Sequence, residues 1–131
     1  MSTIAKAEKA NHEIHAKLVP DKDGQQHAVL PDMPKSMFRG ETVHYSSTDG
    51  DVRIEFFDDN DLPSLSPFLE PNGSVKTVIT SAEPPIKLSK EGKFFCHCFI
   101  TPPGEKARIG WNKLKSPQSG GNHDVRKPPT P

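Results

Sequence analysis

Long hydrophobic runs and an excess of charge of either sign are absent from this sequence of 131 residues. Hydrophobic residues make up only 32%, and no stretch approaches the roughly 18 apolar residues of a membrane-spanning helix. The 17 basic residues balance the 17 acidic ones, so no long-range field attracts the chain to nucleic acid or to an anionic membrane. We therefore expect neither a membrane protein nor a nucleic-acid binder.

Cysteine is scarce as well, with Cys96 and Cys98 as the only two. Two residues spaced in this way along a strand lie about 6–7 Å apart with parallel Cβ vectors, so a disulfide between them is disfavoured. The N-terminal stretch MSTIAKAEKANHEIHAKL lacks the apolar region of a signal peptide. Both observations favour a reducing, cytoplasmic setting.

Sequence motifs of the common enzyme classes are missing too. The chain contains no GxSxG, no P-loop, no HExxH and no GxGxxG. We therefore expect a non-enzymatic protein without a cofactor, although an active site assembled only in space would leave no such motif.

The length allows one domain, and the 14 prolines together with the low apolar share predict a modest core with disordered ends. Residues 1–24 are rich in helix formers but carry only a weak apolar stripe, which predicts a disordered or frayed helical tail. Residues 127–131 form a Pro-rich C-terminal tail. The ordered domain is expected over residues 25–126.

Within this domain the hydrophobic pattern has period two, which is typical of β-strands. Asp49-Gly50 stands between two alternating runs and predicts a hairpin. Many short strands separated by turns predict an all-β fold, a single antiparallel Greek-key sandwich with flexible N- and C-terminal tails. The strands are expected at residues 27–30, 42–46, 51–57, 74–81, 86–89, 93–100, 107–111 and 123–125.

The strand expected at 93–100 contains both cysteines. Its alternation divides the side chains into two faces, Phe94, Cys96, Cys98 and Ile100 on one and Lys93, Phe95, His97 and Phe99 on the other. The cysteines are then inert core residues, and CxC is not the paired spacing of a structural zinc site. The alternative is a metal or redox site that uses Cys96 or Cys98 with His44, His97 or His123, because His44 could face either of the other histidines across the sheet.

The stretch from Gly92 to Cys98 resembles the cupredoxin pattern, in which a glycine opens a strand, aromatic residues alternate and a copper-ligating cysteine ends it. The resemblance covers residues 38–114, implies a cupredoxin-like sandwich and puts Cys98 at the ligand position. Blue copper also needs two histidines and usually a weak axial methionine. No histidine stands near Ser66-Pro67-Phe68 or in residues 99–104, and no methionine follows Met37. The chain thus resembles a cupredoxin without blue copper, and an immunoglobulin-like sandwich is the other arrangement considered.

These observations favour a binding or interaction module with a protein or small-molecule partner. Its contact surface is expected on loops at one end of the sandwich: Asp58–Pro71, Thr101–Lys106 and Ser116–His123. The residues expected to form this surface are Asp58, Asp59, Asp61, Trp111, Lys113 and His123.

Overall fold

The computed structural model describes residues 10–20, 22–57, 65–110 and 121–129, with the side chains of residues 121 and 122 left out of the description. Over these residues the chain forms strands and turns and no helix, so the prediction of an all-β fold is confirmed. In that same part of the chain there is no helix of the length and hydrophobicity that crossing a membrane requires.

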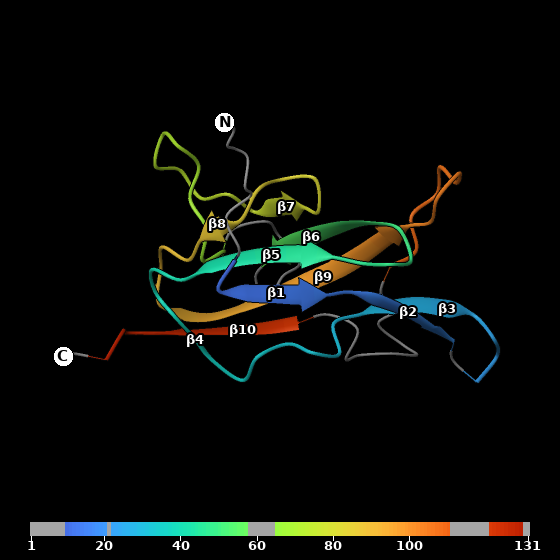
Figure 1. Ribbon diagram of the computed structural model, residues 1–131, viewed down its shortest axis with the longest axis horizontal. Helices are drawn as coiled ribbons and strands as arrows, with labels where there is room; N and C mark the ends of the chain where they lie inside the picture. The colour runs from blue at the N-terminus through green and yellow to red at the C-terminus, as the bar shows by residue number, and fades with distance from the viewer. Residues whose placement is uncertain (1–9, 21, 58–64, 111–120, 130–131) are drawn as a thin grey trace, which may run out of the picture.

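In the described part of the chain, ten strands make up three sheets (Figure 1). They are β1 (His12–His15), β2 (Lys17–Pro20), β3 (Gln26–Val29), β4 (Met37–Phe38), β5 (Thr42–Ser46), β6 (Asp51–Phe57), β7 (Val78–Thr80), β8 (Ile86–Lys87), β9 (Gly92–Thr101) and β10 (Gly121–Arg126). The larger sheet has the order β4-β10-β9-β6-β7, the smaller sheet has the order β1-β5-β8, and β2 and β3 form a two-stranded ribbon. The smaller sheet lies against the larger one, and the two make a sandwich (Figure 1).

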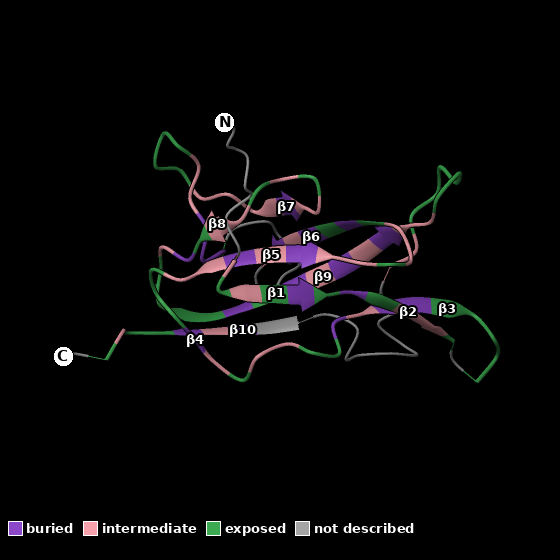
Figure 2. Ribbon diagram, viewed as in Figure 1, coloured by how far each residue is buried: buried purple, intermediate pink, exposed green. Residues whose placement is uncertain are grey.

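The strands predicted at 51–57 and 93–100 lie side by side inside the larger sheet. β6 pairs antiparallel with β9, with Ile54 opposite Cys98. The apolar faces of both strands are buried between the two sheets, as Figure 2 shows, whereas Phe95 is 47% exposed. The predicted alternation of both strands is therefore confirmed. The buried residues are Val52, Ile54 and Phe56 on β6, and Phe94, Cys96, Cys98 and Ile100 on β9.

The prediction for residues 1–24 is wrong for the part that the structure describes. Residues 12–15 form β1, which pairs in parallel with β5, and residues 17–20 form β2, which pairs with β3. Ile14 is fully buried in the core. One buried apolar residue in β1 and none in β2 are too weak a pattern to indicate a strand from sequence, and the pairing partners supply the remaining stabilisation. Residues 1–9 lie outside the described residues.

The hairpin predicted at Asp49-Gly50 is also wrong, because β5 and β6 belong to different sheets. The turn instead carries the chain from one sheet to the other. The Asp49 carboxylate accepts a hydrogen bond from the Leu18 amide at 2.9 Å, and Gly50 packs so closely on β9 that a Cβ atom there would overlap the Thr101 carbonyl oxygen. Glycine is therefore required by the close approach of two backbones rather than by a two-residue hairpin.

Several other strands differ from expectation in extent. The strands predicted at 74–81 and 86–89 shorten to β7 and β8, and in place of a strand at 107–111 Ile109 forms only an isolated bridge with Ile100. β4 was not predicted, and it pairs in parallel with β10. The main sheet is otherwise antiparallel, and residues 127–129 follow β10 without regular structure.

Candidate functional site

The two cysteines lie in the core, on the inner face of β9, with His97 on the opposite face. Burial raises the pKa of the Cys98 thiol to about 12, so the reactive thiolate is disfavoured. Cys96 and Cys98 are both free thiols. The interpretation of the cysteines as core residues agrees with this placement.

His123 was predicted for an exposed binding surface, and this prediction is wrong. Its side chain is fully buried, because the alternation of β10 directs His123 and Val125 inward. Nε2 of His123 lies 2.6 Å from the Tyr45 hydroxyl, and the His123 ring packs edge-on against Phe56 with centroids 4.9 Å apart. His123 is thus a core residue that connects the two sheets.

His44 lies on the outer face of the smaller sheet, since its neighbours Val43 and Tyr45 point into the core. Its Nδ1 lies 2.7 Å from a Glu13 carboxylate oxygen, and its Nε2 lies 3.1 Å from the Ser81 carbonyl oxygen. His44 therefore does not face His97 or His123 across a sheet. Among the described residues, no three histidine, cysteine or carboxylate side chains are grouped so that they could hold a metal ion.

Two of the three loops proposed as one contact surface start at opposite ends of β9. Phe57, after which the first loop starts, pairs with Phe95 near the beginning of β9, whereas the second loop follows Thr101 at its end. Six strand residues separate the two positions by roughly 20 Å, so the prediction of a single loop surface is wrong. Five residues predicted for this surface lie outside the described residues: Asp58, Asp59, Asp61, Trp111 and Lys113.

The outer face of β6 and β9 carries a group of aromatic side chains. No catalytic sequence motif indicated this group. The rings of Phe57 and His97 lie with centroids 3.8 Å apart at an angle of 39°. Phe99 meets His97 edge-on at 6.2 Å, and Phe95 is the most exposed ring of the group. We name these four residues the outer aromatic face. The alternation of residues 93–100 indicated three of them.

A charged cluster borders the outer aromatic face. The Glu55 carboxylate accepts hydrogen bonds from Arg53 Nε at 2.6 Å and from Arg108 Nη1 at 2.8 Å, and the Arg108 guanidinium lies 3.8 Å from the centroid of the Phe99 ring. Partial burial raises the pKa of the Glu55 carboxyl, but the hydrogen bonds from Arg53 and Arg108 outweigh this effect, so that the pKa lies below its ordinary value. Sequence reasoning missed Arg108, because no local pattern brings it to Phe99.

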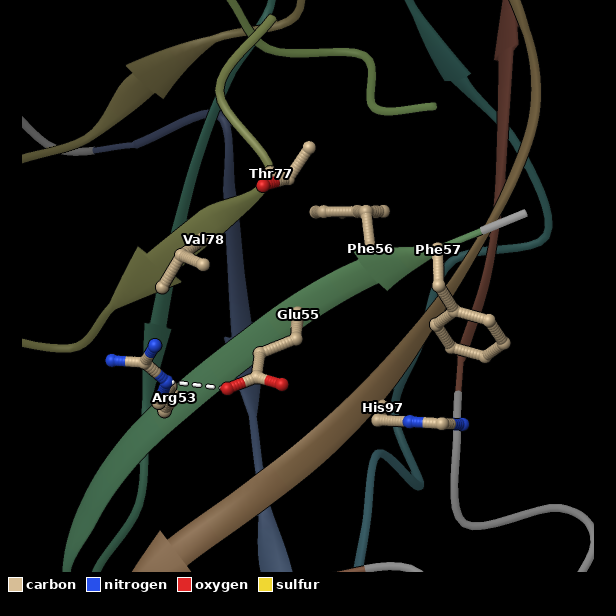
Figure 3. Close-up of a pocket in the computed structure, with 7 residues that line it drawn as sticks. All are labelled: Arg53, Glu55, Phe56, Phe57, Thr77, Val78 and His97. Carbon is tan, nitrogen blue, oxygen red and sulfur yellow. Dashed lines mark hydrogen bonds and ion pairs between the residues drawn. The ribbon is translucent and has the colours of Figure 1, made fainter. Parts of the chain in front are cut away.

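Between these two groups the sheet is hollowed into a shallow pocket of about 250 Å³. Figure 3 shows the Phe57 ring above His97 at one side, and Glu55 turned towards Arg53 at the other. Thr77 and Val78, at the start of β7, also line the pocket. The lining residues are Arg53, Glu55, Phe56, Phe57, Thr77, Val78 and His97.

No protein-family model, no curated protein and no solved structure matches this chain. The chemistry of the outer aromatic face is therefore the guide to function. It offers apolar ring surface, one carboxylate held between two guanidinium groups, and an imidazole that is partly covered by Phe57.

Proposed function

We propose that this protein is a small, non-enzymatic binding module that contacts a protein partner through the outer aromatic face. The observation that supports the proposal is the position of Phe57, Phe95, His97 and Phe99 on the side of the sheet that the sandwich core does not use. The core is filled from the other face of the same strands. These rings are therefore not needed to complete the hydrophobic core.

The exposure of Phe95 supports a contact role. At 47% exposed, this ring lies beside Phe57 in the β6–β9 register. Aromatic side chains are enriched in protein interfaces, and contiguous apolar surface on a monomer marks interaction sites. An exposed ring on the middle strand of the larger sheet, in a group of aromatic side chains bordered by charged residues, has the arrangement of an apolar interface centre with a polar rim.

The size and charge of the site indicate the kind of partner. Its pocket of about 250 Å³ is smaller than the roughly 300–1,000 Å³ of cofactor and drug-sized ligand sites. A single aromatic or aliphatic side chain fits this volume better than a whole small molecule. The one carboxylate and two guanidinium groups beside the site leave a single net positive charge, and the whole chain has a formal net charge of +0, so no strong field of one sign acts on a ligand. We therefore propose an uncharged, extended protein segment as the ligand, rather than nucleic acid or a membrane.

The proposal includes a sandwich of the cupredoxin-like kind that does not form blue copper and that works in the reducing cytoplasm. The position of Cys98 supports this proposal, because Cys98 is the residue that the resemblance puts at the copper-ligand position. Cys98 lies in the core, its neighbour His97 faces the opposite side of the sheet, and His44 bonds elsewhere. The two free thiols are compatible with a reducing compartment.

The test is selection of short peptides from a displayed random library against the wild-type protein, followed by NMR mapping of the selected peptides. We expect uncharged sequences with one aromatic or large aliphatic anchor, and shifts confined to the outer positions of β6, β7 and β9. Phe95→Ser should weaken binding at least about tenfold, as expected for a central aromatic anchor.

Phe38→Ser provides the matched control, because Phe38 is also an exposed phenylalanine, at 36%, but lies on β4. Peptide binding should be unchanged in this variant. Selected peptides that bind Phe95→Ser as tightly as the wild type, or whose shifts map to the smaller sheet, would contradict the proposal.

A further inference from the structure

The N-terminal strand β1 is held to the rest of the protein by three contacts between an imidazole and a carboxylate. His12 Nε2 lies 2.8 Å from Glu41 Oε1, and His15 Nδ1 lies 2.7 Å from Asp32 Oδ2. The third contact, between Glu13 of β1 and His44 of β5, measures 2.7 Å. Three of the four residues of this strand therefore bond to a titratable partner, and the partners come from two segments, Asp32 from one and Glu41 and His44 from the other.

The contact of His44 has a direct implication for its protonation. Nδ1 faces the Glu13 carboxylate and Nε2 faces the Ser81 carbonyl oxygen, and both of these oxygens accept hydrogen bonds. A neutral imidazole has only one N–H and can donate to only one of them, whereas the imidazolium donates to both. The arrangement around His44 therefore fits the charged ring, which connects β1 to the segment that follows β7.

β1 also has contacts that contain no imidazole. Within the described residues it is an edge strand that pairs with β5 alone. Its only buried apolar side chain is Ile14, followed by Ala16 just beyond the strand. Ser46 Oγ donates to Glu13 at 2.7 Å, and the His15 amide donates to Asp32 at 3.0 Å. At the two ends of the strand, the Thr42 amide donates to Asn11 at 2.8 Å and the Ala16 amide donates to the Ser46 carbonyl oxygen at 2.7 Å. The imidazole–carboxylate contacts are therefore the part of this attachment that can change with pH.

We propose that β1 is a pH-dependent latch on the smaller sheet, held by imidazolium–carboxylate contacts at mildly acidic pH and released as these imidazoles lose their protons. The latch is independent of the outer aromatic face, which lies on the other sheet. Its release frees the edge of β5 that β1 covers, and such an edge can pair with another strand.

The signs of two pKa shifts agree with this arrangement. The hydrogen bond to Asp32 raises the pKa of His15, so its contribution is complete below the ordinary value of 6.5 and is lost as pH rises through the higher folded value. Partial burial raises the pKa of Glu41, but hydrogen bonds from His12 and the Phe38 amide outweigh it and the net pKa is lowered. The Glu41 contribution is therefore present above the ordinary value of 4.5 and is lost only in stronger acid.

Other charged groups near β1 do not replace these contacts. Lys17 follows the strand and is exposed, and Lys87 stands beside Thr42 in the register of β5 and β8. Arg39 is paired with Glu91 at 3.1 Å. For His15, the negative charges that act on it are those of Asp32 and Glu13. Imidazole is the side chain that ordinarily changes charge between mildly acidic and mildly alkaline pH, whereas lysine and arginine keep their charge over that range.

Amide hydrogen exchange of the intact protein, followed by mass spectrometry between about pH 5.5 and 8.5, tests the latch. After division by the intrinsic exchange rates, the opening constant of the segments 12–16 and 42–46 should rise with pH by roughly tenfold, as expected for three modest exposed pairs. Segments 51–57 and 92–101 should keep their protection. In a triple variant with His12→Gln, His15→Gln and His44→Gln, the opening of β1 should be high and independent of pH.

The matched control is Lys76→Met, which removes an ion pair with Glu83 of 2.9 Å that contains no imidazole; it should leave the pH dependence of β1 unchanged. If the triple variant does not fold, His44→Gln alone should still reduce the pH dependence. Opening of β1 that is constant across the pH range in the wild type, or that rises together with opening of β6 and β9, would overturn the proposal.

Discussion

The Tyr45 hydroxyl lies 2.6 Å from Nε2 of His123, although the two residues are 78 positions apart in the sequence. Tyr45 belongs to β5 of the smaller sheet and His123 to β10 of the larger one, so this buried hydrogen bond crosses the interior of the sandwich. Both side chains are fully buried. Burial raises the pKa of Tyr45 well above 10.0, and the hydroxyl therefore remains neutral and able to hydrogen-bond.

Tyr45→Phe should lower the free energy of unfolding by about 1–3 kcal/mol, because Nε2 of His123 loses this partner in a site that water does not reach. Urea denaturation followed by circular dichroism measures the change. The double variant Tyr45→Phe/His123→Leu should be more stable than the sum of the two single effects predicts, since neither polar group then remains. Strict additivity would mean that the two groups are not coupled.

Phe94→Ala should cost roughly 3–5 kcal/mol of unfolding free energy, as expected for a large buried ring. Phe95→Ala is the control on the adjacent position of β9, where the ring is 47% exposed, and a cost below about 1 kcal/mol is expected there. Equal costs at the two positions would show that the faces of β9 are assigned incorrectly. Guanidinium denaturation of both variants measures the two free energies of unfolding.

Gly50→Ala should destabilise the protein more than Gly40→Ala. Both glycines have positive φ angles, 150° and 99°, and alanine costs on the order of 1 kcal/mol in such a backbone. At Gly50 the added Cβ also meets the backbone of Thr101 and Pro102, whereas nothing lies within 4 Å of a Cβ at Gly40. Thermal melting of the two variants gives the comparison, and a smaller effect at Gly50 would contradict this packing.

Cys96 and Cys98 should react slowly with a thiol reagent in the native protein, and both should react at once in denaturant. Burial of both residues blocks access, and the raised pKa of Cys98, about 12, keeps it protonated even near pH 9.

Copper(II) added to the protein should not produce the intense blue absorption of a trigonal copper–thiolate site. Rapid reaction at neutral pH, or a blue band that Cys98→Ser removes, would contradict the assignment of these thiols to the core.

The sequence was sufficient to predict the two central strands. Val52, Ile54 and Phe56 alternate with Arg53 and Glu55, and this pattern alone determines both the strand and its buried face. The same reasoning found the faces of β9. It also indicated Phe95, His97 and Phe99 as outward residues, although it did not show that Phe57 would join them across the β6–β9 register.

Other features depend on partners that are distant in the sequence. β1 has a single buried apolar residue, Ile14, and its contacts to β5 and to Glu41 are not encoded by any local pattern. The Asp49-Gly50 dipeptide indicates a turn. That this turn joins two sheets depends on the hydrogen bond from the Leu18 amide to Asp49 and on the close approach of Gly50 to Thr101. Arg108 reaches Phe99 only because Ile109 bridges to Ile100.

The pairing of β4 with β10 has a consequence for the order in which the chain can fold. Met37 finds its strand partner Val125 only after nearly all of the described chain has been synthesised. β6 likewise has only the short β7 as a neighbour until β9 emerges from the ribosome. Loop-closure entropy makes such distant pairing slow. Strands whose partners have not yet been synthesised expose unpaired backbone edges. The nascent chain is therefore exposed to aggregation through these strand edges until β9 and β10 have been synthesised.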